Sequence, residues 1–265
     1  MIGPHPDPTG AESLIGLVPA AGHAIRLGSP SGSKELLPVW LPQGARGGER
    51  LPAVHCLLSA FEAASIERTL VVLRNGKEDI RESLGTVTAG GMRLEYVKVE
   101  DTPSPPFTLD AAVPRLSDAT VTMGFPDILF EPLDAVRRML ASLNRTEADI
   151  VLGLFPHPWV RRADVVELEA DSLVRAVHSS GDTSSAAWTW GLAAWRPRFT
   201  RFLHEYLTRI GATSPGAGRL GVGDVVNAAI ENGLGVGGEV VSDTPFLDIG
   251  TPDALEEAYR RLRDL

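Results

Sequence analysis

A stretch near the start of the chain combines small residues with cations in the way that a polyphosphate site requires. Residues 14–22 read LIGLVPAAG, and Arg26 and Lys34 follow shortly after. An apolar strand that ends in small residues allows backbone N–H groups to approach phosphate oxygens, and nearby cations neutralise the phosphate charge. The pattern predicts a nucleoside triphosphate site. The alternative is an ordinary tight turn whose small residues serve packing.

A dinucleotide-binding domain also opens with a glycine-rich turn after its first strand. Its GxGxxG spacing is not met after residues 14–19, and the apolar run 69–74 ends in Arg74. Dinucleotide-binding domains have an acidic residue at the end of that second strand, where it binds a ribose hydroxyl. The residues therefore do not fit a dinucleotide site.

Two aspartates follow apolar runs that lie far apart in the sequence. Asp127 comes after residues 121–126, and Asp248 comes after residues 245–247. Sheets of α/β proteins bind ligands where their strands end, and Mg²⁺ is typically held by one or two carboxylates together with water and phosphate oxygens. The pair therefore indicates a magnesium site. The alternative is that Asp127 caps a turn and Asp248 caps the last helix.

Composition and charge exclude several classes of protein. The 265 residues are 43% hydrophobic and carry a formal net charge of -9, which suits a soluble domain with a large core and disfavours a nucleic-acid partner. The single cysteine, Cys56, cannot form a disulfide or a thiolate metal site within the chain and favours a cytoplasmic location. No apolar run approaches the roughly 20 residues that span a bilayer, so we expect no membrane partner. Residues 1–12 are expected to form a flexible tail.

Apolar runs alternate with amphipathic segments through the first half of the chain. This alternation predicts an α/β fold with a mostly parallel, doubly wound sheet. Strands are expected at residues 14–19, 68–74, 92–99, 119–124 and 148–155, and helices at residues 50–65, 77–84, 108–116 and 131–143. Pro132 is expected in the first turn of the last of these helices, where its missing N–H costs nothing.

The second half of the chain predicts a mixed extension of the sheet. Residues 165–177 indicate a hairpin around a polar turn, and further elements are expected as a strand at 186–195, helices at 197–210 and 222–232, and a short strand at 245–249. A terminal helix is expected from Pro252, with Thr251 as its N-cap.

Four blocks of the sequence together resemble a known family. They are residues 18–22 with Arg26, residues 33–38 (SKELLP), residues 124–130 with Asp127, and residues 247–252 (LDIGTP). In order and spacing they resemble the sugar nucleotidyltransferases of the glucose-1-phosphate thymidylyltransferase type over nearly the whole chain. The resemblance implies a Rossmann-like nucleotidyltransferase fold over residues 13–265, with a nucleotide-binding part at 13–155 and a sugar-binding part at 156–265.

The activity that the resemblance implies is Mg²⁺-dependent transfer of a nucleoside monophosphate from a nucleoside triphosphate to a sugar 1-phosphate. The products would be a nucleotide sugar and pyrophosphate. Two anions must meet in this reaction, so positioning and charge neutralisation supply the catalysis and no side-chain nucleophile is needed. The resemblance also allows a homo-oligomer.

The same resemblance assigns roles to residues of the nucleotide site. Arg26 would hold the β and γ phosphates, Lys34 would contact the reacting phosphates, and Asp127 would share a magnesium ion with Asp248. Arg26, Lys34 and Asp127 are thereby the predicted catalytic residues. Three small residues would lie along the base and ribose, namely Ala20, Ala21 and Gly22.

Further residues are candidates on weaker patterns. Asp110 is a candidate for the nucleotide, although a position at a helix start would explain it equally well. Glu167 and the neighbouring Trp190 and Gly191 are candidates for the sugar. Strand glutamates are more often solvated, and clustered tryptophans are more often part of a core.

The chain departs from the family pattern at three places. The motif GxGTRL is replaced by GHAIRL at residues 22–27, the glycine-rich segment that reads the base by SPPFTLD at 104–110, and the acidic, Lys and Pro residues that bind the sugar phosphate by Ser179, Ser180 and Gly181. Two alternatives to a sugar nucleotidyltransferase therefore stay open. One is a nucleotide-binding paralogue without catalysis, and the other is an enzyme for a non-sugar acceptor such as an amino alcohol phosphate or a phosphonate.

Overall fold

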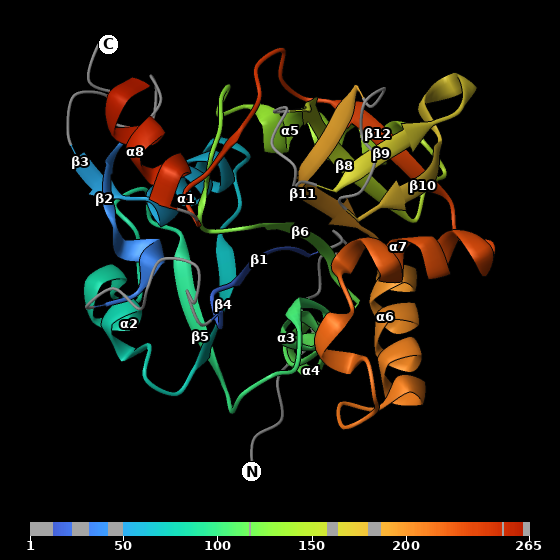
Figure 1. The fold of residues 1–265 in the computed structure, drawn as a ribbon, viewed down its shortest axis with the longest axis horizontal. Coiled ribbons are helices and arrows are strands. Elements are labelled where there is room, and N and C mark those ends of the chain that lie inside the picture. Colours follow the sequence, from blue (N-terminus) through green and yellow to red (C-terminus); the bar gives the residue numbers. More distant parts are fainter. Residues whose placement is uncertain are drawn as a thin grey trace.

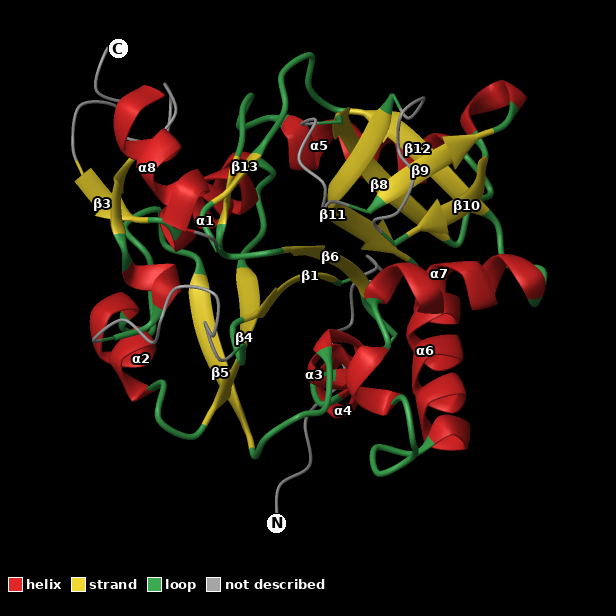
Figure 2. Ribbon diagram, viewed as in Figure 1, coloured by secondary structure: helices red, strands yellow, loops and turns green. Residues whose placement is uncertain are grey.

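The centre of the protein is one mixed β-sheet (Figures 1 and 2). The computed structural model describes residues 13–22, 32–41, 50–116, 118–157, 164–179, 187–250 and 252–261. Within them the sheet has nine strands. Its main path runs in the order β10 (Val174–His178), β9 (Val165–Leu168), β11 (Trp188–Trp195), β6 (Thr120–Gly124), β1 (Leu14–Pro19), β4 (Arg68–Arg74) and β5 (Arg93–Val99). Two further strands extend it beside β11, namely β8 (Ile150–Pro156) and β12 (Val236–Val240).

The parallel part of the sheet consists of β6, β1, β4 and β5. Strand β1 lies between β4 and β6, and its apolar side chains are buried on both faces, as expected of a central parallel strand. Gly16 of β1 faces Thr69 and Phe61. A Cβ at Gly16 would lie 2.3 Å from Thr69 Oγ1 and 2.8 Å from the Phe61 ring, so the close packing of α1 on the sheet requires glycine here.

Helices cover both faces of the sheet, each over its own hydrophobic cluster. One face carries α1 (Val54–Ala63), α2 (Glu78–Leu84) and α5 (Ala135–Arg145). The other carries α3 (Pro105–Asp110), α4 (Val113–Leu116), α6 (Pro197–Ile210) and α7 (Val222–Glu231). The predicted doubly wound α/β fold is therefore confirmed.

The second half of the chain continues the same sheet with reversed strands. Strand β11 pairs antiparallel with β6, β8 and β9, and β9 and β10 form the predicted hairpin. Strand β12 pairs parallel with β8 and was not predicted. Its sequence VGGEV contains two glycines, which conceal a strand from propensity rules.

Two small antiparallel ribbons lie outside the main sheet. One joins β2 (Pro38–Trp40) to β3 (Arg50–Pro52), and the other joins β7 (Ile128–Leu129) to β13 (Leu247–Asp248). A short 3₁₀ helix, η2 (Lys34–Leu36), precedes β2, and α8 (Pro252–Arg261) follows β13. None of the helices in the described part of the chain is long and apolar enough to cross a membrane.

Several predicted boundaries were wrong. The helix expected at 50–65 begins only at Val54, because residues 50–52 form β3. The segment expected as a helix at 108–116 is divided into α3 and α4, so Asp110 ends a helix and does not start one. Helix α5 begins at Ala135, which leaves Pro132 before the helix and outside its first turn. Residues 1–12 and Thr251 lie outside the described residues.

Candidate active site

The ribbon of β7 and β13 brings the segments of Asp127 and Asp248 together. Asp248 is paired with Ile128 across the ribbon, and the Ile249 N–H donates to the Asp127 carbonyl at 2.9 Å. Asp127 lies just beyond β6, at the carboxyl end of a central strand, where α/β sheets bind their ligands. Two aspartates that are distant in the sequence thus reach one edge of the sheet.

The ammonium group of Lys34 contacts the first of these aspartates. Its Nζ donates to the Asp127 carboxylate, and Asp127 is only 8% exposed. Burial by itself would lower the pKa of Lys34, but the pKa is raised overall because Asp127, Glu35 and Asp248 supply negative charge around the ammonium. The structure therefore places the cation of the segment SKELLP beside the predicted magnesium ligand Asp127, with Asp248 close enough to act on its pKa.

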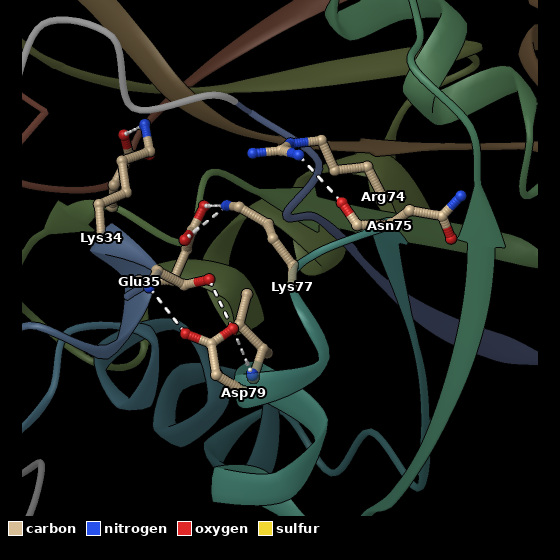
Figure 3. A network of polar contacts seen from close by, with 9 residues as sticks. Lys34, Glu35, Arg74, Asn75, Lys77 and Asp79 are labelled. Atoms are coloured by element: carbon tan, nitrogen blue, oxygen red, sulfur yellow. Dashed lines mark hydrogen bonds and ion pairs between the residues drawn. The ribbon is translucent and has the colours of Figure 1, made fainter. Parts of the chain in front are cut away.

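The residues on either side of Lys34 bind the start of α2 (Figure 3). The Ser33 N–H and hydroxyl donate to the Asp79 carboxylate at 2.7 and 2.8 Å. Lys77 Nζ donates to both oxygens of Glu35 at 2.7 and 2.8 Å. Sequence reasoning missed Glu35, Lys77 and Asp79. The only available signal was an acid directly before an apolar run, which is an unusual place for a solvated charge.

The small residues that follow β1 run from the buried sheet to the surface. Ala20 and Ala21 are buried, and the Ala20 N–H donates to the Val72 carbonyl at 2.9 Å, which extends the pairing of β1 with β4. Gly22 is exposed, and a Cβ there would meet nothing within 4 Å. Arg26 lies outside the described residues, so its predicted role stays a prediction.

Asp110 is held by the outer helical layer. Its carboxylate binds His204 Nδ1 of α6 at 2.8 Å, and the Asp110 side chain is 23% exposed. No contact between Asp110 and Lys34 or Asp127 occurs among the described residues. A structural partner therefore accounts for Asp110, and a role at the nucleotide stays a prediction.

Trp190 and Gly191 lie against the segment that carries Asp127. The Trp190 ring packs on Phe125, with ring centroids 5.7 Å apart. Gly191 sits where the pairing of β11 with β8 shifts in register, and a Cβ there would lie 2.6 Å from Ile128 Cδ1. Trp190 is only 4% exposed, so much of its surface serves packing.

Glu167 has a different environment. Its side chain is 42% exposed and binds Arg175 at 3.0 Å and His178 at 3.1 Å. The His178 hydrogen bond, together with Arg175, lowers the pKa of Glu167. No described contact links Glu167 to Trp190 or Gly191.

Asp164 is a half-buried acid that sequence reasoning missed. Burial raises the pKa of Asp164, and the indole of Trp190 partly opposes this rise. The Trp190 Nε1 is buried without a hydrogen bond of ordinary geometry, although Asp164 is near enough to interact with it. A carboxylate beside an aromatic ring is a suitable group for binding a polyol hydroxyl.

Two surface hollows formed by described residues lie elsewhere. One of about 300 Å³ is beside α2, lined in part by Arg74, Lys77, Arg81 and Lys98, and one of about 630 Å³ is beside α6. Neither is lined by Asp127 or Asp248. The charged groups that converge on Lys34 therefore identify the candidate site better than surface shape does.

The donor set fits a hard divalent cation that shares its ligands with a substrate. No group of three or more His, Cys, Asp or Glu side chains in the described residues could hold a metal by itself. Mg²⁺ needs only one or two carboxylates when phosphate oxygens and water complete its shell. Asp127 and Asp248 meet that requirement.

Comparison with known proteins shows what kind of fold holds these groups. No protein-family model and no curated protein matches the sequence. Among solved structures, a putative glucose-1-phosphate thymidylyltransferase from Bacillus anthracis superposes with a TM-score of 0.79 at 16% identity, over 96% of each chain. This chain has the fold of the sugar nucleotidyltransferases.

Two further structures support the nucleotidyltransferase fold. The inositol-1-phosphate CTP transferase from T. maritima superposes with a TM-score of 0.70 at 16% identity, over 96% of this chain and 98% of that one. A UDP-glucose pyrophosphorylase from Acinetobacter baumannii superposes with a TM-score of 0.74 at 13% identity, over 95% and 93%. The predicted Rossmann-like nucleotidyltransferase fold is confirmed.

Proposed function

We propose that this protein transfers a nucleoside monophosphate from a nucleoside triphosphate to a sugar 1-phosphate, and that it requires Mg²⁺. The observation that carries the proposal is the convergence of Asp127, Asp248 and Lys34 at the carboxyl edge of a sheet with the nucleotidyltransferase fold. Because the identity to the matched structures is low, they support only the fold, and the proposed activity rests on these three residues.

In the proposed reaction, an oxygen of the sugar phosphate attacks the α-phosphorus of the triphosphate. The new P–O bond forms as the bond from the α-phosphorus to the β-phosphate oxygen breaks, and pyrophosphate leaves with the electron pair. The Lys34 ammonium offsets the charge that gathers on the reacting phosphates. When bound to Asp127 and Asp248, Mg²⁺ would neutralise phosphate charge and orient the triphosphate.

The remaining residues of the proposed nucleotide side would bind the triphosphate directly. Ala20, Ala21 and Gly22 would lie along the base and ribose, because their small side chains leave the backbone approachable. Arg26 would bind the β and γ phosphates. The Lys34 contact with Asp127 would loosen when phosphates arrive, since both groups then gain new partners.

On the acceptor side, Trp190 and Gly191 are proposed to line the sugar site because they pack against Phe125 and Ile128, next to Asp127. An aromatic plane suits a pyranose face, and Asp164 would accept a hydroxyl hydrogen bond. The free and buried thiol of Cys56 suits a cytosolic enzyme.

A second candidate function has one specific observation in its favour. Ser179 and Ser180 stand where relatives carry the acidic and Lys residues that hold the sugar phosphate. An acceptor other than a sugar 1-phosphate, such as an amino alcohol phosphate or a phosphonate, would present its anionic group in a different position, where other residues would neutralise it. Mass spectrometry of nucleotidylated products from a mixed acceptor panel separates the two functions.

Pyrophosphate release tests the proposed function. The purified protein is incubated with Mg²⁺, a panel of nucleoside triphosphates and a panel of phosphorylated acceptors, with and without a chelator. Asp127→Asn and Asp248→Asn should each lower kcat/KM by at least about 100-fold, because each removes a charge that acts on the reacting phosphates. Asp118→Asn is the matched control, since the Asp118 side chain is 91% exposed.

The control should keep wild-type rates. No turnover across both panels would defeat the proposed function. Equal rates for the Asp127, Asp248 and Asp118 variants would instead exclude the two aspartates from it.

A further inference from the structure

Lys34 and Glu35 are neighbours in η2 but bind opposite partners (Figure 3). Lys34 contacts Asp127, whereas Glu35 binds Lys77 through both carboxylate oxygens. The Glu35 and Lys77 side chains are 1% and 4% exposed, so this ion pair is almost fully buried. It also ties the Glu35 side chain of η2 to Lys77, the residue directly before α2.

A buried ion pair of this kind is a poor device for stability. Removing both charges from water costs free energy that their mutual attraction only partly returns, and an apolar pair of similar volume often serves a fold equally well. Burial raises the pKa of Glu35 and lowers the pKa of Lys77, and each is opposed by the partner's charge. Helix α2 already packs into the core through Ile80 and Leu84. Stability therefore does not account for this ion pair, and its role is better sought in how it positions the residues around it.

A second anchor holds the other side of Lys34. Ser33 donates two hydrogen bonds to Asp79, one from its backbone and one from its hydroxyl. The residues before and after Lys34 are thus both fixed to the start of α2. Little backbone freedom remains for Lys34, and only its side chain can move between Asp127 and an incoming phosphate.

We propose that Glu35, Lys77, Ser33 and Asp79 form a clamp whose task is to position the Lys34 ammonium for the transfer step. The inference rests on the proposed function, and within it these four are positioning residues that touch no substrate. A cation that neutralises charge on reacting phosphates acts only at the correct distance, and misplacement by about 1 Å can cost 100-fold in rate.

A double variant removes the clamp without leaving a charge buried alone. Glu35→Leu with Lys77→Met replaces the ion pair by apolar side chains of similar size. We expect it to fold with a wild-type unfolding midpoint and to lower kcat by roughly tenfold to 100-fold. The KM for the triphosphate should change by less than about threefold, because Lys34 keeps its charge.

Amide hydrogen exchange measures the clamp without any substrate. The Leu36 and Leu37 amides donate to Ser33 and Lys34 within η2 and report on its rigidity. Their exchange should accelerate at least about tenfold in the double variant, since local opening governs protection. The matched control is Glu78→Gln with Lys98→Met, which removes an exposed pair at 3.2 Å near the same helix. The control should alter neither exchange nor kcat.

Each outcome either supports or overturns the proposed role of the clamp. Unchanged exchange and unchanged kcat in a folded double variant would overturn it, and so would faster exchange with unchanged kcat, which would mean a purely structural role. If the double variant does not fold, Asp79→Asn provides the same readouts, because it weakens the Ser33 anchor and leaves the buried Glu35–Lys77 pair intact. A wild-type protein without turnover defeats the proposed function, and the exchange experiment then still shows whether the clamp holds η2.

Discussion

The proposed nucleotide side and the proposed acceptor side of the candidate site differ in how their polar groups are held. On the nucleotide side the charges are buried and paired, as in Lys34 with Asp127 and Glu35 with Lys77. On the acceptor side the ion pairs of Glu167 are exposed, and the groups near Asp127 are an aromatic ring and a glycine. Buried charges in fixed positions are preorganised for reacting phosphates. Exposed ion pairs such as those of Glu167 can change with little cost to the fold, which suits a region that selects an acceptor.

The sharpest test of this contrast is Lys34→Met. The substitution leaves Asp127 buried without its cation and removes positive charge from the reacting phosphates. We expect kcat/KM for pyrophosphate release to fall by at least about 100-fold, by analogy with the loss of a single preorganised donor in other enzymes. A loss below about tenfold would mean that the nucleotide side does not depend on this cation.

The titration of Cys56 reports how tightly the segment after Asp127 is packed, because its thiol lies against that segment. Its thiol lies 3.5 Å from the Phe130 carbonyl, and burial raises the pKa of Cys56 to about 12. The unfolded thiol titrates near 8.5, so the folded state holds the proton longer and loses stability as pH rises above that value. Between about pH 8 and pH 9.5, ionisation of this thiol in the unfolded state should lower the free energy of unfolding by roughly 1 kcal/mol.

Urea unfolding of wild type and Cys56→Ala across this pH range measures the effect. Other groups titrate in both proteins, so the difference between the two curves isolates the thiol. Equal pH dependence in the two proteins would show that the segment is loose enough for the thiol to ionise in the folded state.

Glu167→Gln should have the smallest effect. An exposed side chain with its own surface partners contributes little, so we expect the acceptor KM to change by less than about threefold. A rise of tenfold or more, measured with the acceptor that the panel identifies, would restore Glu167 as a sugar ligand and make the acceptor side as dependent on charge as the nucleotide side.

Local patterns were sufficient for much of the fold. Strands β1 and β4 and helix α6 have the predicted bounds, because continuous apolar runs and a regular helical period mark them within one segment. Strand β12 was missed and residues 50–52 were assigned to a helix. Both are strands only because a partner lies beside them, and short segments carry no periodic signal of their own.

The candidate site shows the same division. Residue types and the resemblance were enough to select Lys34, Asp127 and Asp248, and the structure brings these three together. Their predicted roles, like those of Arg26, Asp110 and Glu167, stay predictions. Glu35 and Lys77 were missed because a buried ion pair depends on two segments meeting, and neither segment alone shows that its charge will be buried.

The sequence by itself determined most strands of the main sheet, the net negative charge of the chain and the residue types that suit polyphosphate chemistry. These properties follow from composition and from periods of two and 3.6 residues, which act over a few neighbours. Only the tertiary structure decided that the β7–β13 ribbon brings the segments of two distant aspartates together, that η2 is anchored to α2, and that Trp190 packs on Phe125. Such contacts arise when the sheet and its helices close around a shared core, and no local pattern encodes them.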